Sequence, residues 1–153
     1  MSKIMVAYFS TSGNTEKAAK AIATAAKADL YEIKPAHGYS MMDLDWTNNQ
    51  SRTSVEMNDD ESRPPLASSD GDFSMYDTMY IGFPIWWYTA PHIIRSFLEA
   101  YDFTGKNITF FATSGGGGIE SAVTDLKRDY PELQILGGKL IHGVPEEDVL
   151  ATL

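Results

Sequence analysis

Apolar residues along the chain gather in short runs that alternate with segments of helical periodicity. Most runs are almost continuously apolar and rich in β-branched or aromatic residues, which is typical of strands buried on both faces of a sheet. One shorter run has an alternating pattern, as expected near a sheet edge. The sequence predicts strands over Lys3–Phe9, Leu30–Lys34, Thr78–Phe83, Asn107–Thr113 and Leu133–His142, of which Leu30–Lys34 is the alternating one.

Helical patterns lie between the predicted strands, with apolar residues at spacings of three and four. Pro91 near the start of one segment and Pro131 just beyond another are typical of helix boundaries. Strands that alternate with helices predict a parallel sheet with helices on both faces. The expected helices are Thr15–Lys27, Ala90–Tyr101, Ile119–Tyr130 and a short Glu146–Leu153.

A polar segment, residues 35–74, interrupts this alternation. Loops of this length are uncommon in compact domains and tend to be functional. We expect partial helix over Asn49–Met57 and irregular covering structure elsewhere. Trp46 fits either the core or a lid over a ligand. No repeat or linker divides the chain, so we expect a single domain over residues 1–153 that contains this long insertion.

Charge and cysteine content narrow the possible functions. The 153 residues carry a formal charge of −9, which disfavours nucleic acid and anionic membranes as partners. The sequence contains no cysteine, which excludes disulfides, a thiolate nucleophile and cysteine-held metals, and fits a reducing cytoplasm. We expect no signal peptide and no membrane span. The three scattered histidines suggest no metal site, and His92 is expected at the surface or in a helix cap.

Three unusual loops follow the first, third and fourth predicted strands. Ligands of open parallel sheets bind at the carboxyl ends of the strands, where these loops meet. The first loop, "STSGNT" (residues 10–15), has hydroxyls and a glycine at a helix start, which suits either a helix cap or an anion site. The second, "PIWWYTAP" (84–91), offers aromatic rings, and the third, "TSGGGG" (113–118), allows close backbone approach to a ligand. Together they predict a site for a phosphorylated planar ring system.

The three loops lack the residues that other classes of nucleotide-binding and phosphate-handling α/β proteins require. A P-loop needs a lysine at the end of its glycine loop, and a dinucleotide fingerprint needs two further glycines after the first strand. A receiver domain would have aspartate where Pro84 stands, and a tyrosine phosphatase of low molecular weight needs a cysteine. These exclusions favour flavin mononucleotide (FMN) as the ligand.

The motifs "VAYFSTSGNTEKAAKAI", "YIGFPIWWYTAPHIIRSFLEAYDFTGK" and "TSGGGG" resemble those of flavodoxins, in particular short flavodoxin-like proteins with "GFPIWW" in the second loop. The resemblance implies a three-layer α/β/α sandwich whose five-stranded parallel sheet has the order 2-1-3-4-5, with FMN bound non-covalently. It implies that the phosphate contacts Ser10, Thr11, Ser12, Gly13, Asn14 and Thr15; the flavin contacts Pro84, Ile85, Trp86 and Trp87; and its pyrimidine edge and ribityl chain contact Thr113, Ser114, Gly115, Gly116 and Gly117. Ala7 departs from the family pattern, which has a bulkier residue there.

Two activities are compatible with this resemblance. An electron carrier would pass single electrons between partner proteins, whereas a reductase would take hydride from NAD(P)H and reduce a quinone-like acceptor. The third loop has no aromatic residue to cover a second flavin face, which favours the reductase. A binding or regulatory flavoprotein without turnover is a weaker alternative. We identify no catalytic side chain, because the flavin supplies the redox chemistry. The resemblance to short flavodoxin-like reductases, which often dimerise, also implies a homodimer.

Overall fold

The computed structural model describes residues 3–11, 13–68, 71–113 and 118–141. Strands and helices alternate along the chain as expected, and the short helix expected in the insertion lies between the second and third strands. In order they are β1 (Ile4–Tyr8), α1 (Asn14–Ala26), β2 (Asp29–Glu32), α2 (Arg52–Met57), β3 (Thr78–Pro84), α3 (His92–Ala100), β4 (Asn107–Thr113), α4 (Glu120–Asp129) and β5 (Gln134–Ile141). The helix expected over Glu146–Leu153 lies outside the described residues.

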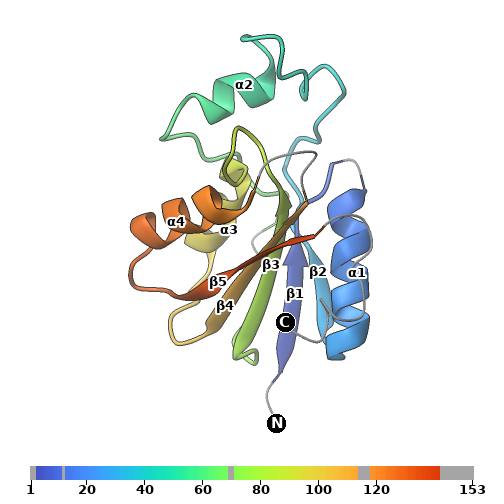
Figure 1. Cartoon of the computed structure of the whole chain (residues 1–153), viewed down its shortest axis with the longest axis vertical. Helices are drawn as coiled ribbons and strands as arrows, with labels where there is room; N and C mark the ends of the chain where they lie inside the picture. The colour runs from blue at the N-terminus through green and yellow to red at the C-terminus, as the bar shows by residue number, and fades with distance from the viewer. Residues whose placement is uncertain (1–2, 12, 69–70, 114–117, 142–153) are drawn as a thin grey trace.

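All five strands belong to one parallel sheet with the order β2-β1-β3-β4-β5, which confirms the predicted fold class. Helix α1 covers one face of the sheet, and α3 and α4 cover the other (Figure 1). Helix α2 lies beyond the carboxyl ends of the strands, above the sheet in this view. Because β1 pairs with both β2 and β3, the strand order reverses beside β1, and this is where ligands of doubly wound sheets bind.

Alternate residues of the central strands belong to two hydrophobic clusters, one on each face of the sheet. Ile81 and Phe83 of β3 belong to the larger cluster, under α3 and α4, whereas Tyr80 belongs to the smaller cluster under α1. Gly82 also faces the smaller cluster, where a Cβ atom would lie 2.1 Å from Cζ of Phe111. A glycine is required there because the phenyl ring packs directly on the strand backbone. Both faces of the sheet are therefore closely packed.

The larger cluster contains a group of aromatic rings that join α3 to the insertion and to β2. The Phe97 ring lies 5.2–6.0 Å from four other aromatic rings, measured between centroids. Those four are Tyr31, Phe73, Tyr101 and Phe103. Edge and offset contacts of this kind stabilise a core beyond the area that they bury. The end of the insertion is thus packed into the main core.

Three expectations from the sequence need correction in the helices and the insertion. Helix α3 begins at His92 and not at Ala90, because Pro91 occupies the N-cap with an extended backbone. The partial helix of the insertion is confirmed but is confined to Arg52–Met57, where the Ser51 side chain caps it by accepting from the Ser54 N–H. Trp46 is 73% exposed, so the alternative that it fills the core is wrong.

A partly buried hydrogen bond to the edge strand makes the free energy of unfolding depend on pH in the alkaline range. The Tyr76 hydroxyl donates to Asp29 over 2.5 Å, and this bond together with burial raises the pKa of Tyr76 to about 12. In an unfolded chain the pKa is about 10. The contribution is complete below pH 10 and is lost as the pH rises from about 10 to about 12. Between pH 9 and 11 we expect a loss of up to about 1 kcal/mol in the free energy of unfolding.

Urea denaturation of the wild type and two variants at pH 9 and pH 11 measures this effect. Tyr76→Phe should show a smaller pH-dependent loss than the wild type. Tyr88→Phe, which changes an exposed tyrosine, should retain the full loss. Identical pH dependence in all three proteins would contradict the assignment to Tyr76.

Candidate functional site

The turn between β1 and α1 leaves the start of the helix open to a ligand. Gly13 is the N-cap with φ of 92°, a conformation that favours glycine, and its N–H donates to Oγ of Ser10 over 3.1 Å. No side chain caps α1 in the part of the chain that the structure describes. The first-turn N–H groups of this 13-residue helix therefore remain available, with the helix dipole favouring an anion there.

Two threonine hydroxyls connect this turn to the end of β4. Oγ1 of Thr15 lies 2.7 Å from Oγ1 of Thr113, and both side chains are buried, Thr15 with only 1% exposed. The Thr113 carbonyl accepts a hydrogen bond from the Ile85 N–H over 2.9 Å. Thr113 thus contacts both the first and the second loop. The described parts of the three predicted loops meet at one edge of the sheet.

The second loop reverses direction in a tight turn with unusual torsions. The backbones of Trp86 and Thr89 exchange two hydrogen bonds of 3.0 Å, and the two residues between them have φ angles of 50° for Trp87 and 63° for Tyr88. Positive φ at both central positions is the pattern of a type I′ turn, which usually contains glycine or asparagine. The turn holds the Tyr88 side chain outward, 76% exposed, and Thr89 anchors it by donating to Asp125 of α4. The aromatic loop therefore has a fixed shape.

Trp86 belongs to a group of three rings from three separate segments, Phe9, Tyr39 and Trp86, called here the aromatic triad. The ring centroids lie 5.4–5.7 Å apart in all three pairs, and every pair is edge-to-face. Phe9 follows β1 and is buried, while Tyr39 belongs to the insertion. The sequence patterns did not indicate Phe9 or Tyr39 as site residues, because the contact depends on how the insertion folds back. The insertion therefore reaches the predicted site through Tyr39.

Charged groups of α2 surround the Tyr39 ring. The Arg52 guanidinium lies 3.8 Å from the ring centroid, and the Tyr39 hydroxyl donates to Glu56 over 2.6 Å. Burial and this bond to a carboxylate raise the pKa of Tyr39 well above its ordinary value. At the end of β1, burial and the nearby Glu32 and Glu16 carboxylates raise the pKa of Tyr8 to about 12. Both phenols are therefore neutral at physiological pH.

His92 lies inside the protein, and neither the surface nor the helix-cap expectation is correct. Its ring is buried, and Nδ1 lies 2.7 Å from Oγ of Ser62 in the insertion. Ser62 donates its one hydroxyl proton to the Glu56 carbonyl, so in its contact with His92 the Ser62 oxygen accepts and the Nδ1–H donates. Burial and the nearby Arg95 and Arg63 lower the pKa of His92. This chain of bonds ties the segment after α2 to the start of α3.

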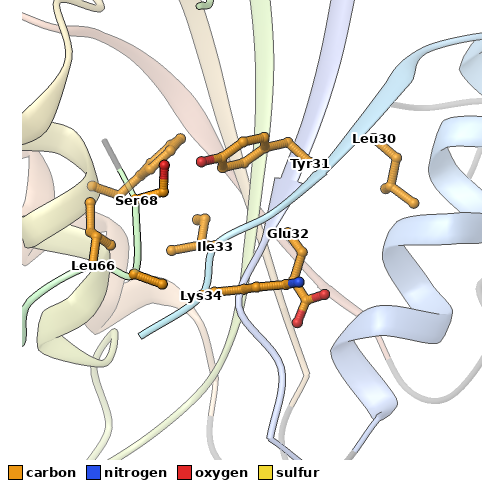
Figure 2. Close-up of a pocket in the computed structure, with 9 residues that line it drawn as sticks. Leu30, Tyr31, Glu32, Ile33, Lys34, Leu66 and Ser68 are labelled. Atoms are coloured by element: carbon orange, nitrogen blue, oxygen red, sulfur yellow. The ribbon is translucent and has the colours of Figure 1, made fainter. Parts of the chain in front are cut away.

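A cavity of about 350 Å³ lies elsewhere, at the free edge of β2 (Figure 2). Its walls come from β2 and the residues just after it, from the segment around Leu66, and from Phe97. In the close-up, the Tyr31 ring points toward Ser68 on the facing segment, while Leu30 points away. None of the lining residues belongs to the three loops, so this cavity is separate from the predicted ligand site. The lining residues are Leu30, Tyr31, Glu32, Ile33, Lys34, Leu66, Ala67, Ser68 and Phe97.

The structure brings most of the predicted contact residues to one place without testing their contact with a ligand. Those described are Ser10, Thr11, Gly13, Asn14, Thr15, Pro84, Ile85, Trp86, Trp87 and Thr113. Ser12, Ser114, Gly115, Gly116 and Gly117 lie outside the described residues. All fifteen ligand contacts therefore remain predictions.

A doubly wound five-stranded sheet with a site beside the β1–β3 reversal defines the flavodoxin-like class of α/β proteins. A family model described as flavodoxin matches residues 3–153. The chain therefore belongs to the flavodoxin family. Its similarity to the narrower "GFPIWW" group remains a prediction.

Solved structures from several bacteria are similar over nearly the whole chain. A protein from Bacteroides uniformis with the name "Putative flavoprotein" is 46% identical with a TM-score of 0.95, covering 99% of this chain and 96% of that one. A flavoprotein from Lactobacillus acidophilus, solved in complex with FMN, is 24% identical with a TM-score of 0.73, covering 92% and 93%. Oxidised Flavodoxin 2 from Bacillus cereus is 20% identical with a TM-score of 0.56, covering 98% and 91%. The comparison with curated proteins found no match.

In the part of the chain that the structure describes, no helix has the length and apolar character that a membrane span needs.

Proposed function

We propose that the protein binds FMN non-covalently and acts as an NAD(P)H-dependent reductase of quinone-like acceptors. The observation that carries the FMN proposal is the open start of α1, which lies beside the hydroxyls of the first loop and is linked through Thr113 to the aromatic loop. A phosphate and a planar ring find complementary groups at one sheet edge. Membership of the flavodoxin family supports the same ligand.

The donors in the first loop fit a phosphate dianion. Backbone N–H groups of α1 and the hydroxyls of Ser10, Thr11 and Thr15 can donate to phosphate oxygens without a basic side chain. Thr15 can donate to phosphate while it accepts from Thr113, because a hydroxyl has one proton and two lone pairs. The buried Thr113 hydroxyl would keep the Thr15 side chain in the orientation that phosphate binding needs.

The aromatic loop fits the flavin ring. Trp86 offers an aromatic surface in the second loop, and its contacts with Phe9 and Tyr39 restrict how its ring can turn. When bound, FMN supplies hydride and electron transfer chemistry. The protein would bind the phosphate, orient the ring and restrict access of water from the sheet side.

The choice of a reductase rests on how much of the flavin the chain can cover. Trp86 can stack on one face, whereas residues 114–118 contain no aromatic side chain for the other. An uncovered face would admit a nicotinamide ring close to the reactive flavin nitrogen. Tyr88 favours the second candidate, a one-electron carrier, because its ring is exposed in the same loop as Trp86 and could cover part of the flavin.

Stopped-flow reduction of the FMN-loaded protein by NADH and by NADPH tests the proposal. A reductase should bleach the flavin absorbance in a saturable step faster than free FMN, followed by rapid re-oxidation with a benzoquinone. Free FMN at the same concentration is the control. Bleaching no faster than that control would reject the reductase and favour the carrier.

The same proposal extends to partners and location. A reductase would need only NAD(P)H and a small acceptor, whereas a carrier would need a redox partner protein. A second copy of the chain could complete an open flavin face in a homodimer, and size-exclusion chromatography with light scattering tests this. The lack of cysteine in the sequence favours action in the cytoplasm.

A further inference from the structure

Within the part of the insertion that the structure describes, Tyr39 brings its ring against Trp86 of the predicted flavin site, and no ligand-contact motif includes Tyr39. We propose that Tyr39 is a positioning residue for the flavin: Arg52 and Glu56 of α2 hold its ring against Trp86, and the insertion thereby sets the orientation of the aromatic surface that receives the isoalloxazine. This inference rests on the proposed binding of FMN. It assigns a role to residues 39–56 that neither the fold nor the family match assigns.

The geometry of the aromatic triad carries the first step. Trp86 meets Phe9 at 5.5 Å with an interplanar angle of 86°, and Tyr39 at 5.4 Å with an angle of 73°. Tyr39 and Phe9 also meet each other, at 5.7 Å. The three contacts close a triangle, so no ring can rotate without disturbing the other two. Phe9 is buried at the end of β1 and provides the fixed member.

Helix α2 anchors the Tyr39 ring. The Arg52 guanidinium stacks 3.8 Å from the ring centroid, while its Nη1 donates to the carbonyls of His37 over 2.7 Å and Gly38 over 3.1 Å. Arg52 thus fixes the Tyr39 ring and the backbone just before it. Its Nε donates to Glu56 over 3.0 Å, and Glu56 accepts from the Tyr39 hydroxyl. One arginine and one carboxylate therefore hold both the face and the tip of the ring.

Helix α2 is itself attached to the main body, which makes the anchor effective. The Ser62 hydroxyl joins the Glu56 carbonyl to Nδ1 of His92 at the start of α3. Farther along the insertion, the Ala67 N–H donates to the carbonyl of Lys34, just after β2, over 2.8 Å. The segment that carries Arg52 is thus bonded at more than one point. Loss of Arg52 should therefore loosen Tyr39 without detaching the insertion.

The role predicts a specific signature in ligand binding. Tyr39 supports the aromatic surface that would receive the flavin ring. It lies in a different segment from the hydroxyls that are predicted to bind the phosphate. Removing its support should weaken FMN and riboflavin by the same factor, because both have the same ring. The free energy of a partly buried cation–π contact, such as that of Arg52 with Tyr39, corresponds to a change of about three- to thirtyfold in affinity for the flavins.

Arg52→Ala is the test variant, and Lys127→Ala is the control, because Lys127 is an exposed cation on α4 far from the triad in sequence. Arg52→Ala should weaken FMN and riboflavin equally within that range and change the visible circular dichroism of the bound flavin. Arg52→Lys keeps the cation but lacks the planar fork, so it should restore part of the affinity. Tyr39→Phe keeps the ring and should have a smaller effect than Arg52→Ala. The control should match the wild type in all measurements.

Near-ultraviolet circular dichroism of the ligand-free protein separates this inference from the proposed function. The signal of Trp86 is identified as the difference between the wild type and Trp86→Phe, and it should decrease in Arg52→Ala. Unchanged affinities with an unchanged Trp86 signal, or a loss confined to FMN, would overturn the role of Tyr39. A wild-type protein that binds neither flavin would instead overturn the proposed function, and the Trp86 signal would still decide whether Arg52 orients the triad.

Discussion

Phe97→Ala should lower the free energy of unfolding by about 3–5 kcal/mol, the usual cost of removing a buried phenyl ring from a core. Phe97 is buried on α3, and its ring contacts four other aromatic rings. These rings come from β2, from the end of the insertion and from the connection between α3 and β4. A cavity at this position is surrounded by rigid rings that cannot collapse into it, which places the expected cost in the upper part of the range for core substitutions.

Denaturant unfolding followed by far-ultraviolet circular dichroism measures the change. Val55→Ala on α2 is the control, because its side chain is exposed and its removal should change stability by no more than about 0.5 kcal/mol. A loss below about 1 kcal/mol for Phe97→Ala would show that the aromatic cluster is not part of the cooperative core.

The second large effect concerns the phosphate. Thr15→Ala should weaken FMN by roughly one to two decades, because a hydrogen bond to a charged group is worth about 1.5–3 kcal/mol and about 1.4 kcal/mol corresponds to tenfold. Riboflavin lacks the phosphate and should bind almost unchanged. Thr113→Val, which keeps the shape but removes the hydroxyl that orients Thr15, should produce a smaller loss in the same direction.

Fluorescence titration of both flavins against these variants provides the measurement. Thr24→Ala is the matched control, since Thr24 lies on the same helix but its hydroxyl donates to the Lys20 carbonyl on an exposed surface. It should bind both flavins as the wild type does. Equal losses of FMN and riboflavin in Thr15→Ala would reject the assignment of this threonine to the phosphate.

The sheet could be predicted from the sequence because its signals are local. Asn107–Thr113 forms β4 with the expected bounds, since a buried central strand is a continuous apolar run that ends at polar residues. The boundary of α3 was less accurate, because proline suits both the N-cap and the first helical position and the local pattern does not distinguish them. The meeting of three loops at one edge follows from the parallel topology alone.

The contacts of the insertion could not be predicted in the same way. Tyr39 meets Trp86, and Ser62 meets His92, across long stretches of chain with no shared periodicity. Arg52 and Tyr39 are polar or amphipathic residues in an irregular segment, where no hydrophobic pattern indicates which side faces the protein. Such pairs depend on how the chain folds back, which single-residue preferences do not encode.

The pairing of β1 with β3 has a consequence for chain entropy. Ile4 is opposite Thr78, so the first strand joins its central partner only after the whole intervening chain has closed into a loop. The entropic cost of closing a loop rises with the logarithm of its length, by about 0.6 kcal/mol for each doubling. The insertion contributes roughly half of this loop and thus adds only about that amount. The contacts of the insertion, and not the entropy of loop closure, therefore limit how far its length can change. A chain without the insertion would still need a slow search to pair β1 with β3.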